Sequence, residues 1–248
     1  AIGEYPYHEG REFLEDKPFV EPMVAIAAMS QATTTLHFST FVIKLAIRDA
    51  LIAAKTALSV AVMNGNRLTM GVGISPWLDD FQYCNVPFEG RGKRLDEMIE
   101  VLRGVQSGDY FEYHGDHFDF TRLKMCPVPD QPVKITVGGH SPPALRRAAK
   151  LGDGWVAANI TREQARGLVG MLNGYRKEFG SDANADYIVQ AMLTDIDVFS
   201  PDGYREGEDI GLTDVTLSPW GVYDTEQLEL SERLDRIKRF ADEVIAKY

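Results

Sequence analysis

Residues 134–155 read KITVGGHSPPALRRAAKLGDGW, and this stretch decides the fold class. Residues 135–137 have the apolar, β-branched composition of a buried strand, which a pair of glycines then ends. Residues 144–151 follow with the composition of a helix, and a second buried segment starts at Gly154. The order strand, tight turn, helix, strand predicts one βαβ unit.

The turn inside this unit is a candidate phosphate site. Ser141 suits the N-cap of the helix, and Pro142 suits its first position, where a missing N–H costs nothing. A helix N-terminus presents N–H groups and a dipole that favours an anion. Gly138 and Gly139 would let a phosphate approach the backbone closely. The pattern therefore indicates the phosphate-binding turn of a cofactor site, with a tight turn that binds nothing as the alternative.

Composition excludes several classes of partner. The chain has 248 residues, of which 44% are hydrophobic and 25% charged, as in an ordinary globular protein. Its net charge of −11 argues against nucleic acid or an anionic membrane as the main partner. No apolar run reaches the length of a membrane span, and no secretory signal opens the sequence. The two isolated cysteines, Cys84 and Cys126, suggest reduced thiols in a cytoplasmic protein and no metal site.

Strands and helices alternate along the rest of the chain. Strands are predicted to begin near residues 36, 67, 133, 154, 187 and 214, the first covering 36–42 and the fifth 187–198. Helices are predicted at 18–33, 48–63, 95–102, 144–151, 161–179, 201–210 and 225–247. Loops are expected at 1–17 and 74–90, and a small hairpin is expected to be inserted at 108–132.

This alternation implies a parallel sheet covered by helices. Two architectures satisfy it, an open doubly wound sheet and a (β/α)₈ barrel. Gly73 and Gly138 at strand ends, the inserted hairpin and a length near the usual barrel size of about 250 residues favour the barrel. No GxGxxG follows a first strand, which weakens the dinucleotide-binding alternative. The predicted strands are nevertheless too few to close a barrel alone.

Three blocks occur in an order that resembles the luciferase-like monooxygenase superfamily. They are NRLTMGVGISPWLDDF at 66–81, VPFEGRGKRLDEMIEVLRGV at 86–105 and VGGHSPPALRRAAKLGDGW at 137–155. The resemblance implies a TIM (β/α)₈ barrel of the bacterial-luciferase type and a cofactor that is F420 or FMN. It covers nearly the whole chain from about residue 18, and residues 1–248 are expected to form one domain. Relatives carry a first βα unit and a second strand ahead of this point, so we expect this sequence to lack the N-terminal part of the family barrel.

The resemblance also implies a set of cofactor-binding residues. The phosphate end would lie on the backbone amides of Gly139, His140 and Ser141, which follow Gly138. A second turn would reach the phosphate or the tail beyond it through Asn159 and Thr161. For Thr161, a plain N-cap is an equally weighted alternative.

The ring of the cofactor is expected near the ends of two other strands. The loop after Gly73 would border it through Ser75 and Trp77. Many relatives have a non-proline cis peptide that forms a bulge behind the ring, and in this sequence we place it at Phe41–Val42.

No catalytic acid or base is assigned. Asp80 is expected to pair with a basic residue such as Arg91 and so to hold the loop. Arg91, Arg94, Asp96 and Glu97 are expected to form solvated ion pairs on the polar side of a helix.

The function that this resemblance favours is hydride transfer between F420 and a small organic substrate. An FMN-dependent monooxygenase, supplied with reduced flavin by a reductase partner, is the alternative. A family member that binds a cofactor or ligand without turnover is the third possibility. Helix 48–63 is apolar on more than one face, which predicts a homodimer interface.

Overall fold

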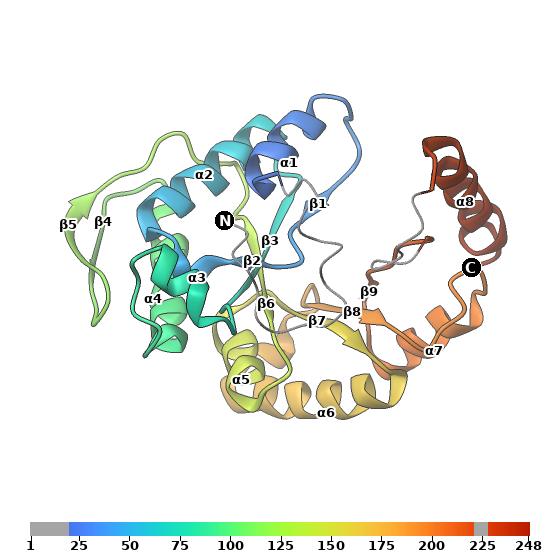
Figure 1. The fold of residues 1–248 in the computed structure, drawn as a ribbon. Coiled ribbons are helices and arrows are strands. Elements are labelled where there is room, and N and C mark those ends of the chain that lie inside the picture. Colours follow the sequence, from blue (N-terminus) through green and yellow to red (C-terminus); the bar gives the residue numbers. More distant parts are fainter. Residues whose placement is uncertain (1–19, 221–227) are drawn as a thin grey trace. The chain divides into compact units, whose positions relative to one another are not determined.

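The computed structural model describes residues 20–220 and 228–248 (Figure 1). The loop predicted at 1–17 and the start of the predicted last helix lie outside these residues. The contacts divide the chain into two compact units. The first unit runs to Gly138 and includes Leu151–Asp153, and the second comprises Gly139–Lys150 and Gly154–Tyr248. None of the helices in the described ranges has the length and hydrophobicity that a membrane span requires.

The sheet of the first unit is parallel, as predicted. Its strands are β1 (Phe38–Ser39), β2 (Ile43–Lys44), β3 (Leu68–Gly73) and β6 (Lys134–Gly138). Both β1 and β2 pair with β3, which pairs with β6 on its other side. Every residue of β3 is buried, as expected for a strand covered on both faces. The prediction of one strand over 36–42 is wrong, because only Phe38–Ser39 of this segment form a strand, and the next strand, β2, begins after a break at Ile43.

The break lies at residues 40–42, where the chain passes close to β3. The Phe41–Val42 peptide bond is cis, as predicted. The Thr40 hydroxyl donates a hydrogen bond to the Gly71 carbonyl oxygen at 2.8 Å. A Cβ atom at Gly71 would lie 1.8 Å from the Thr40 carbonyl oxygen, so only glycine fits there.

Val42 explains two further glycines. A Cβ atom at Gly73 would lie 2.9 Å from Val42 Cγ2, and one at Gly138 would lie 3.1 Å from Val42 Cγ1. The side chain of Val42 therefore occupies the space that these two residues leave open. At Gly138, glycine makes room for a neighbouring side chain, in addition to any role that it has toward a ligand.

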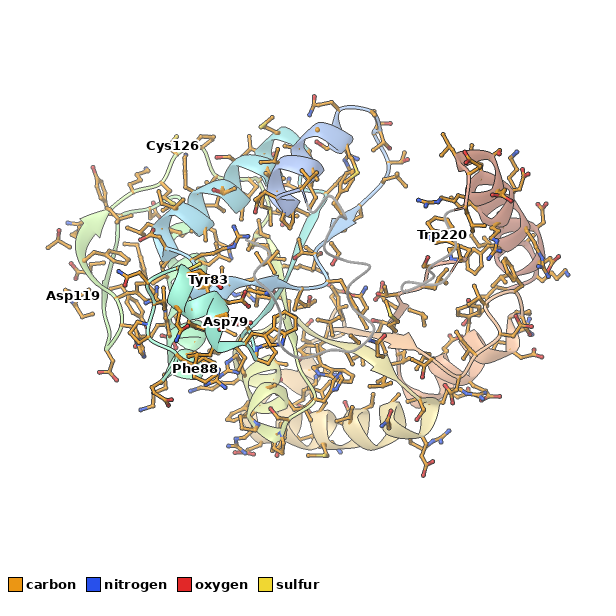
Figure 2. All side chains as sticks on the ribbon, in the orientation of Figure 1. Asp79, Tyr83, Phe88, Asp119, Cys126 and Trp220 are labelled. Atoms are coloured by element: carbon orange, nitrogen blue, oxygen red, sulfur yellow. The ribbon has the colours of Figure 1, made fainter. Side chains whose placement is uncertain are left out.

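Helices cover the sheet of the first unit. They are α1 (Pro22–Ser30), α2 (Ala50–Met63), α3 (Leu78–Tyr83) and α4 (Arg91–Val105), with a 3₁₀ turn at Leu45–Ile47. The carboxylate of Glu21 caps α1 by accepting the N–H groups of Met23 and Val24 at 2.7 and 3.0 Å. Helices α1 and α2 lie side by side (Figure 1). Helix α3, which carries Asp79 and Tyr83 (Figure 2), falls in the segment predicted as a loop and corrects that prediction.

The inserted hairpin is confirmed and is anchored to α4. It consists of the antiparallel strands β4 (Phe111–His114) and β5 (Asp119–Leu123). Glu97 accepts the backbone N–H groups of Asp116, His117 and Phe118 at 2.9, 2.9 and 3.0 Å. The Arg94 guanidinium lies 4.4 Å from the centre of the Phe118 ring. The prediction of solvated ion pairs is therefore wrong for Arg94 and Glu97, which hold the hairpin.

The second unit contains three further parallel strands in the order β7, β8, β9. Its elements are α5 (Pro142–Leu151), β7 (Gly154–Ile160), α6 (Arg162–Phe179), a 3₁₀ turn (Ser181–Ala183), β8 (Ile188–Leu193), α7 (Asp202–Ile210), β9 (Asp214–Val215), α8 (Leu230–Glu243) and a 3₁₀ turn (Ile245–Lys247). Strand β8 is shorter than the predicted 187–198, because its pairing ends where its partner β7 ends at Ile160.

The close contact at Gly71 gives a stability prediction. Gly71→Ala should lower the free energy of unfolding by about 3 kcal/mol, because its Cβ collides with backbone that cannot move aside easily. Gly170→Ala is the matched control, since a Cβ there meets no atom within 4 Å and alanine favours the helix by up to about 1 kcal/mol. Urea unfolding followed by circular dichroism measures both. Equal midpoints for the two variants would contradict the assigned packing.

Candidate functional site

The turn between β6 and α5 has a conformation that requires glycine. Gly139 has a φ of 129°, a region that L side chains rarely adopt. A Cβ atom there would also lie 2.8 Å from the Cβ of Ala144. The N–H of Gly139 donates to the Val156 carbonyl oxygen at 3.3 Å. The N–H of Gly139 is therefore already hydrogen-bonded within the protein. The backbone donors that remain for the predicted phosphate site are the N–H groups of the two residues that follow.

Those two residues, His140 and Ser141, present their backbone N–H groups at the start of α5. Within residues 20–220 and 228–248, neither N–H has a hydrogen-bond partner. The helix begins at Pro142, as predicted, and neither Pro142 nor Pro143 has an N–H to offer. Two donors thus stand at the positive end of a helix dipole, an arrangement that suits an anion such as a phosphate.

Trp155 holds this turn in place, a role that sequence reasoning missed. Its side chain is fully buried, and its indole Nε1–H donates to the Gly139 carbonyl oxygen at 2.8 Å. In the first unit, Asp153 accepts the Ile135 N–H at 2.8 Å and pairs with Arg103 at 2.5 Å. The Asp and Trp of the GDGW sequence therefore have structural roles around the strands and the turn.

The second predicted turn has a different local structure. Asn159 has a φ of 54° and lies in a bulge of β7, between Ala157 and Ile160. The Thr161 hydroxyl accepts the Gln164 N–H at 3.2 Å, and the Gln164 side chain accepts the Thr161 N–H at 2.9 Å. This capping box shows that Thr161 acts as the N-cap of α6. Contact of either Asn159 or Thr161 with a cofactor remains a prediction.

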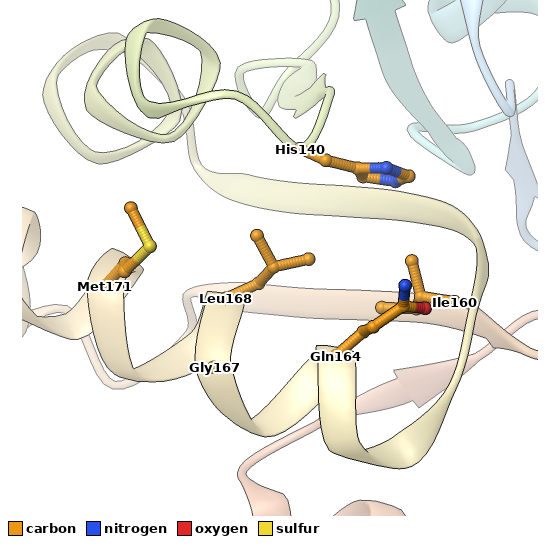
Figure 3. A pocket seen from close by; sticks show the side chains of 6 residues that line it. All are labelled: His140, Ile160, Gln164, Gly167, Leu168 and Met171. Atoms are coloured by element: carbon orange, nitrogen blue, oxygen red, sulfur yellow. The ribbon is translucent and has the colours of Figure 1, made fainter.

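A pocket of about 350 Å³ lies beside the first turn (Figure 3). It is lined by His140, Ile160, Gln164, Gly167, Leu168 and Met171. The side chain of His140 faces Gln164 and Leu168 of α6 (Figure 3). Desolvation lowers the pKa of His140 below its ordinary value, although the side chain keeps part of its surface exposed. The second unit thus combines two N–H groups that suit an anion with a mainly apolar pocket.

The first unit carries a charged cluster at the carboxyl ends of β2 and β3. Lys44 Nζ lies 2.6 Å from Asp80 Oδ2 and 4.3 Å from the centre of the Trp77 ring. The Ser75 hydroxyl donates to Asp80, and the Trp77 N–H donates to Ser75 Oγ at 3.2 Å. Asp80 thus pairs with a basic residue, as predicted, but this residue is Lys44 and not Arg91. Arg91 lies 3.7 Å from the centre of the Phe88 ring instead, in the segment that leads from α3 to α4 (Figure 2).

Exposure separates the predicted ring contacts into two groups. Ser75 is only 1% exposed. Its hydroxyl donates to Asp80 and accepts the Trp77 N–H, so its role is to stabilise the loop. Phe41 and Trp77 are partly exposed, and Val42 is 37% exposed over Gly73. Among the predicted ring contacts, Phe41, Val42 and Trp77 therefore have exposed apolar surface that a planar ligand can contact.

The fold of this chain is similar to that of several solved structures. The F420-dependent tetrahydromethanopterin reductase of Methanopyrus kandleri matches with a TM-score of 0.76 at 15% identity, over 92% of this chain and 88% of that one. An F420-dependent secondary alcohol dehydrogenase matches with a TM-score of 0.63 at 16% identity, over 93% and 72%. These similarities confirm the predicted α/β fold of the luciferase-like TIM-barrel class.

Sequence comparison identifies the family within this class. The family model of luciferase-like monooxygenases matches residues 5–194, and the chain belongs to this family. The protein Rv0940c of Mycobacterium tuberculosis is 43% identical over 98% of this chain and 84% of its own length. The F420-dependent glucose-6-phosphate dehydrogenase of Gordonia bronchialis is 27% identical, over 54% of this chain and 41% of that enzyme. An F420-dependent hydroxymycolic acid dehydrogenase of M. tuberculosis is also 27% identical, over 55% and 39%.

The lowered pKa of His140 predicts a pH-dependent stability. The unfolded chain binds a proton near the ordinary pKa of about 6.5, whereas the folded chain binds it only at lower pH. The folded form therefore loses stability as the pH falls through this window. His140→Gln removes the titration, so the wild type should lose more stability than the variant between about pH 8 and pH 5. Urea midpoints at the two pH values measure this, and parallel losses in both proteins would contradict it.

Proposed function

We propose that this protein is an oxidoreductase that transfers a hydride between F420 and a small organic substrate. The observation that carries the proposal is the turn at His140 and Ser141, whose N–H groups suit the phosphate of such a cofactor. Family membership supports the class of reaction. The preference for F420 is supported by relatives with a stated activity, among which are the two F420-dependent dehydrogenases named above.

In this proposal the backbone N–H groups of His140 and Ser141 would bind the phosphate of the cofactor. Val42 and Trp77 are proposed separately as contacts of a planar ring, as the family resemblance implies. The cofactor would supply the hydride chemistry, while the protein supplies binding, orientation and electrostatics.

An FMN-dependent monooxygenase is the second candidate. It is favoured by the phosphate-binding turn itself, because FMN also ends in a phosphate that two backbone N–H groups can bind. Such an enzyme would need a reductase partner to supply reduced flavin. A member that binds the cofactor without turnover is the third candidate, since the sequence offers no assigned catalytic acid or base.

We also propose a homodimer formed through α2. This helix buries Ala54, Ala57 and Leu58 within its own unit, yet Ile52 and Met63 remain 67% and 59% exposed.

We further propose a cytoplasmic location for this protein. Cys84 and Cys126 are free thiols, which supports this proposal.

Substitution at Ser141 tests the phosphate site. Ser141→Asp adds a carboxylate beside the two N–H groups, where it repels a phosphate, yet aspartate is a good N-cap and preserves the fold. The affinity for F420 or FMN should fall by at least about tenfold, or about 1.4 kcal/mol. Ser141→Asn is the matched control, because it has the same shape without the charge and should bind nearly as tightly as the wild type.

Two further comparisons sharpen this experiment. Absorbance and fluorescence titrations with F420 and with FMN identify the cofactor, and tight binding of FMN alone would favour the monooxygenase. Titration with riboflavin, which lacks the phosphate, should give the same affinity for the Asp and Asn variants. If Ser141→Asp weakened riboflavin binding as much as FMN binding, the phosphate assignment would be wrong.

The proposed dimer has its own test. Replacing both Ile52 and Met63 by Lys should convert a dimer into a monomer, because charged side chains resist burial in an apolar interface. Sedimentation velocity measures the change. Val24 on α1 and Val20 just before this helix are similarly exposed, at 61% each, and lysines there provide the control. A wild-type monomer at all concentrations would refute the proposal.

A further inference from the structure

We infer that the imidazole of His140 is a further contact of the cofactor phosphate, and that it takes up a proton when the phosphate binds. This inference rests on the proposed function. The family resemblance assigns to His140 only its backbone N–H, so the side chain is a new element of the site. All the residues that the inference needs lie in the second unit.

The backbone of His140 places its ring beside the proposed phosphate site. The N–H groups of His140 and Ser141 have no hydrogen-bond partner in the part of the chain that the structure describes. Covalent geometry holds the ring nitrogens of a histidine within about 6 Å of its own backbone nitrogen. An anion that accepts both N–H groups is therefore held close to this imidazole.

The pocket beside the turn gives this ring room to move. The His140 side chain lines the pocket of about 350 Å³ and faces Gln164 and Leu168 of α6 (Figure 3). Gly167 adds no bulk to the α6 wall, and a Cβ there would meet no atom within 4 Å. Because the His140 side chain also keeps part of its surface exposed, it has space to adopt a rotamer that points toward a bound anion.

The surroundings of the ring are uncharged. The residues that line the pocket with His140 are apolar or, in one case, an amide. Charged residues on the two neighbouring helices have partners elsewhere: Arg162 of α6 binds Glu206, and Arg146 of α5 binds Glu178 at 2.7 Å. Desolvation lowers the pKa of His140, and no charged group within residues 20–220 and 228–248 contributes to this shift. A bound phosphate would therefore be the first counter-charge of the ring.

Binding of a phosphate should reverse the preference of this ring for its neutral form. Without a ligand, desolvation favours the neutral imidazole. A negative charge within about 4–6 Å favours the imidazolium, so the pKa of His140 should rise by about one unit in the complex. A group whose pKa is higher in the complex takes up a proton on binding. The affinity for the cofactor should therefore gain a component that grows as the pH falls.

A ring that only packs against α6 makes a different prediction. His140→Gln keeps the backbone N–H and removes the titration. If the imidazole had a purely structural role, this substitution would change the affinity for the cofactor by the same factor at every pH. The pKa of His140 in the wild type would then be the same with and without the cofactor.

The first measurement compares dissociation constants of the wild type and His140→Gln, using the cofactor, F420 or FMN, that the wild type binds. The affinity of the wild type relative to the variant should rise by up to about tenfold between about pH 8 and pH 5. This ratio cancels any titration of the cofactor itself, which both proteins experience alike. His114→Gln is the matched control, since it removes a histidine from the exposed hairpin and should keep the pH dependence of the wild type.

The second measurement follows the ring directly. NMR of protein labelled with ¹³C at the histidine Cε1 atoms gives the pKa of each imidazole, and the His140→Gln spectrum identifies the signal of His140. The pKa of His140 should rise when the cofactor binds. It should stay constant when the phosphate-free form of the cofactor binds, which for FMN is riboflavin.

The outcomes separate this inference from the proposed function. An affinity ratio that does not change with pH, or a pKa of His140 that the cofactor leaves unchanged, overturns the role of the ring while leaving the backbone phosphate site intact. An equal rise of this pKa with the phosphate-free form overturns it as well, because the phosphate would not be the cause. If the wild type binds neither F420 nor FMN, the proposed function fails and this inference fails with it.

Discussion

The first unit depends on the close passage of residues 40–42 over the glycines of β3 and β6. The backbone of Thr40 and the side chain of Val42 occupy the space that Gly71, Gly73 and Gly138 leave open. This packing explains why β1 ends at Ser39 and a separate strand, β2, begins at Ile43. It also sets the register that brings Lys44 opposite Gly73. A single steric constraint thus determines both the break between β1 and β2 and the position of Lys44 in the sheet.

The sequence predicted the regular elements well because their signals are local. The spacing of apolar residues marked α4, and Pro142 after a glycine pair marked the start of α5. The cis peptide at Phe41–Val42 was predicted from the family resemblance and not from the residues alone. By contrast, α3 lacked a signal within a segment of mixed composition.

The side-chain partners could not be predicted in the same way. Asp80 pairs with Lys44 because strand register brings β2 to the loop after β3, and such register cannot be read along the chain. The adjacent glycines Gly138 and Gly139 show the same limit. The first makes room for Val42 and the second supplies a positive φ, although both were predicted for one reason, the approach of a phosphate.

The anchoring of the hairpin has a consequence for how this region can change. Glu97 binds three consecutive backbone amides, which every residue except proline can supply. Of the tip residues, Gly115 is restricted, because a Cβ there would lie 2.4 Å from Glu97 Oε2. Phe118 is restricted as well, because its ring packs on the Arg94 guanidinium. Asp116 and His117 contribute only their backbone N–H groups to the bond with Glu97, so their side chains can be exchanged while α4 still binds the backbone of the hairpin.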